Sequence, residues 1–83
     1  IDMSQSARTA KQLGALVRRE RRRQGYSQAK LGEKIGLRQA TVSKLEAGEP
    51  ATQLQTLLDA LTALNLEITV RERSKSTDLE QLF

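Results

Sequence analysis

Between residues 13 and 64, apolar side chains recur at the three- and four-residue spacing of helices that bury one face. Four successive groups share this spacing: Leu13, Leu16 and Val17; Leu31 and Ile35; Val42 and Leu45; and Leu54, Leu57, Leu58, Leu61 and Leu64. Glycine follows each of the first three groups, at Gly25, Gly36 and Gly48, where this residue commonly ends a helix. The pattern therefore predicts four helices joined by short connectors.

Residues suited to open a helix stand before these groups. Thr9 and Thr52 are each followed three residues later by glutamine, which is the spacing of a capping box. Ser27 can cap the second helix with its hydroxyl. We expect the third helix to begin near Arg38 and the fourth to end near Asn65.

A two-residue period replaces the helical one after the fourth helix. Leu66, Ile68 and Val70 alternate with polar residues and include β-branched side chains, which is typical of a strand. A single strand has no partner within this chain, and an unpaired strand edge favours association. We therefore expect pairing with the same strand of a second subunit in a two-fold homodimer. The alternatives are an extended tail that lies on its own domain and a dimer contact through the outer surface of residues 54–64.

The chain of 83 residues is expected to form one small domain. Its predicted fold class is all-α: a four-helix domain at residues 9–73, with one C-terminal strand at residues 66–73 that pairs across the dimer. Residues 1–8 are expected to be a flexible N-terminus and residues 74–83 a flexible tail. Met3 is the expected natural start, preceded by two residues left over from cloning.

The composition narrows the chemistry that the chain can perform. It contains no cysteine and no histidine, so we expect neither a disulfide nor a metal site, and no cofactor. The same absence removes the usual general base near neutral pH and the most nucleophilic side chain, and we expect no enzyme activity. Tyr26 and Phe83 are the only aromatic residues, too few for stacking on single-stranded nucleic acid or RNA. No apolar run has the length of a membrane span or a signal peptide, which predicts a cytoplasmic protein.

The charge is divided unevenly along the chain. Residues 8–44 hold eleven lysines and arginines against two acids, a net charge of +9, whereas residues 45–83 carry a net charge of −4. Such a basic half indicates a polyanionic partner, and a solvated helix face is the plain alternative. A membrane surface would require bulky apolar residues opposite the cluster at residues 18–23, and Glu20 interrupts that face.

The segment Gln28–Glu46 carries the functional signal. A helix-turn-helix needs apolar residues that join its two helices to the core, a small residue where the helices cross, and a turn residue that tolerates positive φ. The second and third apolar groups meet the first requirement, and Gly32 and Gly36 meet the other two. Leu37 is expected to plug the turn into the core. Agreement at all these positions favours a helix-turn-helix over an ordinary helical hairpin.

From about Leu13 to Leu64 the chain resembles the Xre/Cro-type helix-turn-helix family, which includes lambdoid phage repressors. Three runs carry the resemblance: Gly25-Tyr26-Ser27-Gln28; Leu31 with Ile35-Gly36; and Val42-Ser43 with Leu45-Glu46 and Gly48. The resemblance implies a four-helix, lambda-repressor-like domain that binds duplex DNA in a sequence-specific manner.

The resemblance also implies roles for the residues at matching positions. Gln28 resembles a glutamine that clamps a DNA phosphate, and Arg21 and Glu46 match an ion pair that braces the first helix against the third. The DNA-binding residues expected on this basis are Ser27, Gln28, Arg38, Gln39, Ala40, Thr41, Ser43 and Lys44. Among them, Gln39 can pair with adenine, and Lys44 can reach a guanine or a phosphate.

Each of these roles has a plainer alternative. Gln39 and Thr41 are compatible with ordinary surface positions, and Gln28 is a favourable first residue for any helix. Arg21 and Glu46 are compatible with unrelated surface charges.

Two residues depart from the family pattern. Gly32 stands where alanine is usual, at a cost of about 1 kcal/mol in helix propensity. Glu20 stands where an apolar residue is usual, which weakens the expected packing of the first helix.

One branch of this family is more similar still. A helix-turn-helix domain followed by a strand at residues 66–71 and a short tail resembles HipB-type antitoxins, and so does the run at residues 38–43. The resemblance implies a homodimer that pairs through its strand, binds a palindromic operator, represses its own operon and holds a HipA-type kinase toxin. The alternatives are a stand-alone phage-type or metabolic repressor without a toxin and, in another class, a protein-interaction adaptor.

Overall fold

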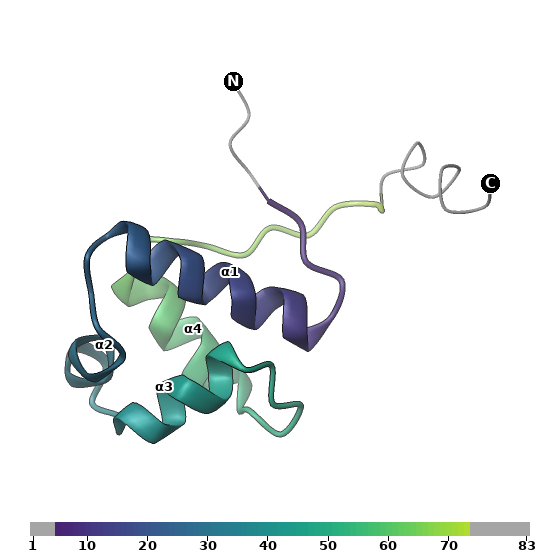
Figure 1. The fold of residues 1–83 in the computed structure, drawn as a ribbon. Coiled ribbons are helices and arrows are strands. Elements are labelled where there is room, and N and C mark those ends of the chain that lie inside the picture. The colour runs from purple at the N-terminus through teal and green to yellow at the C-terminus, as the bar shows by residue number, and fades with distance from the viewer. Residues whose placement is uncertain (1–4, 74–83) are drawn as a thin grey trace.

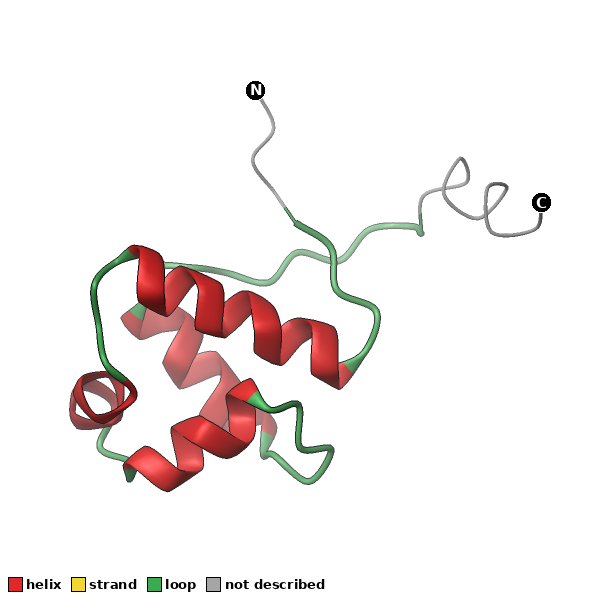
Figure 2. Cartoon of the chain, in the orientation of Figure 1, coloured by secondary structure: helices red, strands yellow, loops and turns green. Residues whose placement is uncertain are grey.

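The computed structural model describes residues 5–73, which form four helices and no strand (Figure 1, Figure 2). In chain order the helices are α1 (Ala10–Arg23), α2 (Gln28–Ile35), α3 (Gln39–Glu46) and α4 (Leu54–Ala63). The all-α class and the four helices predicted from the apolar spacing are confirmed. In Figure 1, α1 lies along the top of the domain above α3 and α4, and α2 stands at one end.

One core joins all four helices. Its buried apolar side chains are Val17, Leu31, Val42, Leu45, Leu57, Ala60, Leu61 and Leu64. A buried leucine or valine contributes about 1.5–3 kcal/mol relative to an exposed position. Every predicted apolar group thus supplies inward residues, but Leu54 and Leu58 of the fourth group are exposed.

Two glycines shape the junction between α2 and α3 in different ways. Gly36 ends α2 with a φ of +70°, a left-handed conformation that glycine adopts without strain. A Cβ at Gly32 would lie 2.6 Å from the carbonyl oxygen of Leu37, so the alanine of the family pattern does not fit here without a shift. The prediction that Leu37 plugs the core is wrong. The residue is only half-buried and is not among those that form or pack on the core, while its carbonyl oxygen lies against Gly32 of α2.

The helix starts follow the predicted caps in α1 and α2. Thr9 Oγ1 accepts a hydrogen bond from the Gln12 N–H, and Ser27 Oγ accepts one from the Lys30 N–H, both at 3.0 Å. The Gln12 side chain accepts from the N–H of Arg8, so the return bond lies one residue earlier than in a capping box.

The capping box predicted at Thr52 is wrong. Helix α4 begins at Leu54, and its N-cap is Gln53, which makes no capping hydrogen bond. The Thr52 N–H instead donates to the carbonyl of Glu49 at 3.1 Å, which places Thr52 in the preceding turn.

Glu20 fits α1 through an ion pair rather than through apolar packing. Its Oε2 lies 2.8 Å from Nε of Arg23, one turn along the same helix. The departure from the family pattern at this position is therefore accommodated within α1 itself.

Residues 66–73 leave α4 without regular secondary structure. A strand requires hydrogen bonds to a neighbouring strand, and residues 5–73 of one chain supply none, so the predicted strand is absent from the single chain. Residues 5–8 are also irregular, while the rest of the predicted flexible N-terminus and the predicted tail at residues 74–83 lie outside the described residues. Within residues 5–73, no helix has the length and apolar character needed to cross a membrane.

Candidate nucleic-acid interface

Helix α3 turns one face to the core and the opposite face to solvent. Val42 and Leu45 are buried against the other helices. Five of the predicted DNA-binding residues are exposed at or near this helix: Arg38, Gln39, Ala40, Ser43 and Lys44. Thr41 lies between the two faces and is half-buried. The exposed face therefore extends from the first turn of α3 to its last turn.

The N-terminal end of α3 is open to a ligand. Arg38 is its N-cap residue, and the Arg38 side chain makes no capping hydrogen bond. The first N–H groups of a helix lack partners within the helix and carry a partial positive charge. Gln39 follows directly, and its amide can both donate to and accept from the edge of an adenine. This end of α3 therefore presents backbone N–H donors and the polar amide of Gln39 at the surface.

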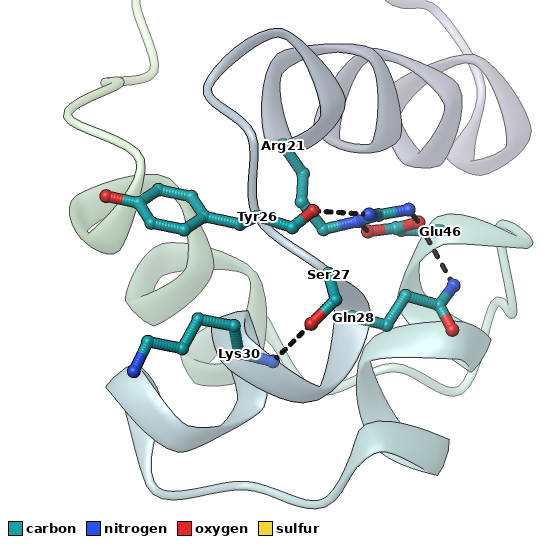
Figure 3. A network of polar contacts seen from close by, with 6 residues as sticks. All are labelled: Arg21, Tyr26, Ser27, Gln28, Lys30 and Glu46. Atoms are coloured by element: carbon teal, nitrogen blue, oxygen red, sulfur yellow. Dashed lines mark hydrogen bonds and ion pairs between the residues drawn. The ribbon is translucent and has the colours of Figure 1, made fainter.

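Helix α2 begins next to the opposite end of α3. Gln28, its first residue, donates a hydrogen bond from Nε2 to Oε1 of Glu46 at 3.2 Å (Figure 3). Ser27 directly precedes Gln28, caps α2 and is exposed to solvent. The bond to Glu46 orients the Gln28 amide and leaves its second N–H for another acceptor.

The structure brings Arg21 and Glu46 together in a buried ion pair between α1 and α3. Arg21 Nε lies 2.7 Å from Glu46 Oε2, and Arg21 Nη2 lies 3.0 Å from Glu46 Oε1. The two side chains are only 8% and 2% exposed. A third bond, from Arg21 Nη1 to the carbonyl of Tyr26 at 2.7 Å, ties the pair to the α1–α2 turn (Figure 3). Together with Gln28, this polar brace connects α1, α2 and α3.

The brace satisfies the buried charge completely. Glu46 accepts three hydrogen bonds, two from Arg21 and one from Gln28. Within the described residues, no buried side-chain nitrogen or oxygen lacks a hydrogen-bond partner. A buried ion pair adds little net stability, but removal of one partner costs about 3–5 kcal/mol because it strands the other charge. The brace therefore fixes where α3 ends relative to α1.

Sequence reasoning missed a close approach of the α3 backbone to α1, which lies at Gly14. A Cβ at Gly14 would lie 2.5 Å from the carbonyl oxygen of Leu45 and 2.6 Å from that of Glu46. The backbone at the end of α3 thus rests directly on α1, and only glycine leaves room for it. A lone glycine inside a helical pattern was the available signal, because it often marks a close approach.

A second missed residue is Gln24, which links the α1–α2 turn to the end of α4. Its Nε2 donates to the carbonyl of Leu64 at 2.8 Å, and the Leu66 N–H donates to the carbonyl of Leu61 at 2.7 Å. These two bonds fix the last turn of α4, from which residues 66–73 depart.

The residues predicted to form the dimer do not gather on one buried face of the single chain. Leu66 packs against the core and is half-buried, whereas Ile68 is 47% exposed and Val70 is 96% exposed. Leu54 and Leu58 of α4 are exposed as well. As for a metal site, no three acidic side chains within residues 5–73 gather closely enough to hold an ion.

Residues 17–70 match the protein family described as Helix-turn-helix. The chain is also similar to two curated proteins named Antitoxin HipB, from two strains of Escherichia coli, each 36% identical over 59 residues. These residues cover 71% of this chain, and 63% and 67% of the two relatives, so the match spans just under two thirds of the first one.

Solved structures of HipB are similar in fold. The HipB–O4 20mer complex superposes with a TM-score of 0.80 at 31% identity, and the HipA–HipB–O2–O3 complex with a TM-score of 0.79 at 31% identity. Each alignment covers 86% of this chain and 100% of the matched HipB chain. The fold of this chain is therefore shared with the HipB chains of these two complexes.

Proposed function

The chain belongs to the helix-turn-helix family, and on that premise we propose that it is a HipB-like antitoxin that binds operator DNA as a homodimer and represses its own operon. The observation that carries the proposal is the division of α3 into a buried face and an exposed one. Val42 and Leu45 hold the helix on the domain, while Gln39 and Lys44 remain exposed. Such a helix reads base edges in the major groove from its first turn.

The neighbouring residues supply contacts that hold the DNA without reading its sequence. Ser27 and Gln28 lie at the start of α2, where N–H donors favour a phosphate group. The bond from Gln28 to Glu46 orients this amide before DNA arrives, which lowers the entropy lost on binding. Arg38, Ala40, Thr41 and Ser43 complete the proposed contact surface along α3.

The proposed dimer forms through residues 66–73. Ile68 and Val70 expose apolar surface, and the backbone there makes no strand hydrogen bonds within the described part of the chain. Pairing with the same segment of a second copy would satisfy the backbone and cover both side chains. Two domains joined in this way would read the two halves of a palindrome.

The proposed protein partner is a HipA-type kinase toxin. The similarity to HipB of the HipA–HipB–O2–O3 complex supports this partner. Co-expression with a kinase-like protein encoded beside this chain, followed by purification, tests it: a stable complex is expected. Failure to co-purify would favour a stand-alone repressor.

The DNA-reading surface is tested by Gln39→Ala. A duplex selected from a random library by the unaltered protein serves as the probe. The variant should lose about 1–3 kcal/mol of binding free energy on this duplex and relax the preference at one base pair. Gln55→Ala is the matched control, because Gln55 is also exposed but lies on α4. An unchanged rank order of duplex variants with Gln39→Ala would refute the assignment of α3 as the reading helix.

A further inference from the structure

A groove runs along α1 beside the C-terminal end of α3. Six of the residues that line it matter here: Lys11, Arg18, Arg19, Arg22, Glu46 and Ala47. Lys11, Arg18 and Arg22 are spaced by seven and four residues, which places them on one face of α1. Figure 1 shows the end of α3 meeting the middle of α1, where Gly14 allows the close contact.

The four cations of this groove are not neutralised by the described part of the chain. None of them forms an ion pair within residues 5–73, whereas the neighbouring Arg23 is paired with Glu20. Glu46 is the one acid in the lining, and it is already paired with Arg21. Like charges four residues apart, as in Arg18 and Arg22, destabilise a helix. The groove therefore concentrates positive charge that suits an anion.

The groove is continuous with the proposed DNA-binding surface. Ala47 caps the C-terminus of α3 and is exposed, so it borders both the groove and the outward face of that helix. Glu46 lines the groove and also accepts the hydrogen bond from Gln28, the proposed phosphate contact. The groove and the proposed phosphate contact at Gln28 therefore meet at Glu46.

We infer that this groove binds phosphates of the same DNA duplex that α3 reads, through Lys11, Arg18, Arg19 and Arg22. The inference rests on the proposed function and extends it to α1, which lies outside the helix-turn-helix pair. The contacts are sequence-independent, since lysine and arginine meet phosphate oxygens and not base edges. They add affinity and steer the protein toward DNA, while the choice of sequence remains with α3.

Salt dependence tests the inference with the full chain. The groove variant combines Arg18→Gln with Arg22→Gln and so loses two positive charges from the groove. The control variant combines Lys30→Gln with Lys34→Gln and loses two positive charges from α2, so both variants have the same net charge. Binding to a short mixed-sequence duplex is followed by fluorescence anisotropy across a series of salt concentrations. The slope of log K against log salt should fall in magnitude by about 0.9 for each phosphate that the protein no longer neutralises, and only in the groove variant.

Three further outcomes decide the matter. Arg18→Lys combined with Arg22→Lys should keep most of the slope, because lysine preserves the charge. If the lysine variant lost as much of the slope as the glutamine variant, a contact based on charge would be overturned. If the unaltered protein binds DNA but the glutamine variant has the same slope, the inference that the groove binds phosphate is overturned. The proposed function stays intact in that case. If the unaltered protein shows no salt-dependent binding to any duplex, the proposed function itself fails. Circular dichroism confirms that each variant folds.

Discussion

The end of the domain formed by α1, α2 and α3 completes its contacts within one chain, and the end formed by α4 and residues 66–73 does not. At the first end, Arg21, Gln28 and Glu46 satisfy one another, and the backbone of α3 rests on Gly14. At the second end, apolar side chains are exposed and the backbone of residues 66–73 forms no strand. The surface proposed to read DNA is therefore fully formed in the single chain, whereas the surface proposed to form the dimer leaves apolar side chains uncovered within the described residues.

The largest effect is expected from Arg21→Ala, at the end of the domain formed by α1, α2 and α3. Because it strands the buried carboxylate of Glu46, we expect a loss of about 3–5 kcal/mol in the free energy of unfolding. Arg23→Ala is the matched control: its side chain is 65% exposed, and removal of its pair with Glu20 should cost about 0–1 kcal/mol. Thermal unfolding followed by circular dichroism measures both. Equal shifts in Tm would show that the brace does not stabilise this end.

A smaller effect is expected from Gly14→Ala. In an exposed helix this change gains up to about 1 kcal/mol from helix propensity. Here the new methyl group would collide with the carbonyls of Leu45 and Glu46, and we expect a net loss of about 1–3 kcal/mol. Urea unfolding gives the sign directly. A more stable variant would mean that α3 stands farther from α1 than described.

The smallest effect on the stability of the single domain is expected from Ile68→Pro, which is directed at the end formed by α4 and residues 66–73. Proline removes a backbone donor that a paired strand would use, but no helix contact depends on it. The helical circular dichroism spectrum should stay unchanged, while sedimentation should show a monomer with weak DNA affinity. Ile68→Val is the control that keeps the donor. A proline variant that remains dimeric at micromolar concentration would move the interface to the outer surface of α4, at Leu54 and Leu58.

The local parts of this structure were predictable from the sequence, and the long-range parts were not. Apolar spacing indicated the four helices, and Gly36 indicated the turn, because both depend on residues within a few positions of each other. The cap of α4 was misplaced because a turn closed by Glu49 takes up Thr52. Hydrogen bonds between backbone groups do not require a particular side chain, so the sequence does not reveal them.

Contacts between residues far apart in the sequence could be found only from the family resemblance or from the structure. The pairing of Arg21 with Glu46 spans 25 residues and was expected only from the resemblance. The bond from Gln24 to Leu64 spans 40 residues and was not expected at all, because a polar residue after a helix has many ordinary uses. The predicted strand differs from these contacts because its hydrogen bonds would lie between two chains. The apolar alternation at residues 66–70 does not identify the partner strand, and the structure of a single chain cannot contain it.

The bond from Gln24 to Leu64 also bears on the distance between the two α3 helices of the proposed dimer. It fastens the departure point of residues 66–73 to the same α1–α2 turn that the Arg21 brace fastens to α3. Within the described residues, α3 and the point where residues 66–73 leave α4 are thus both held to the α1–α2 turn. If two copies pair at residues 66–73 as proposed, this linkage favours one spacing between their α3 helices, and operators with a base pair inserted or removed between the half-sites should bind more weakly.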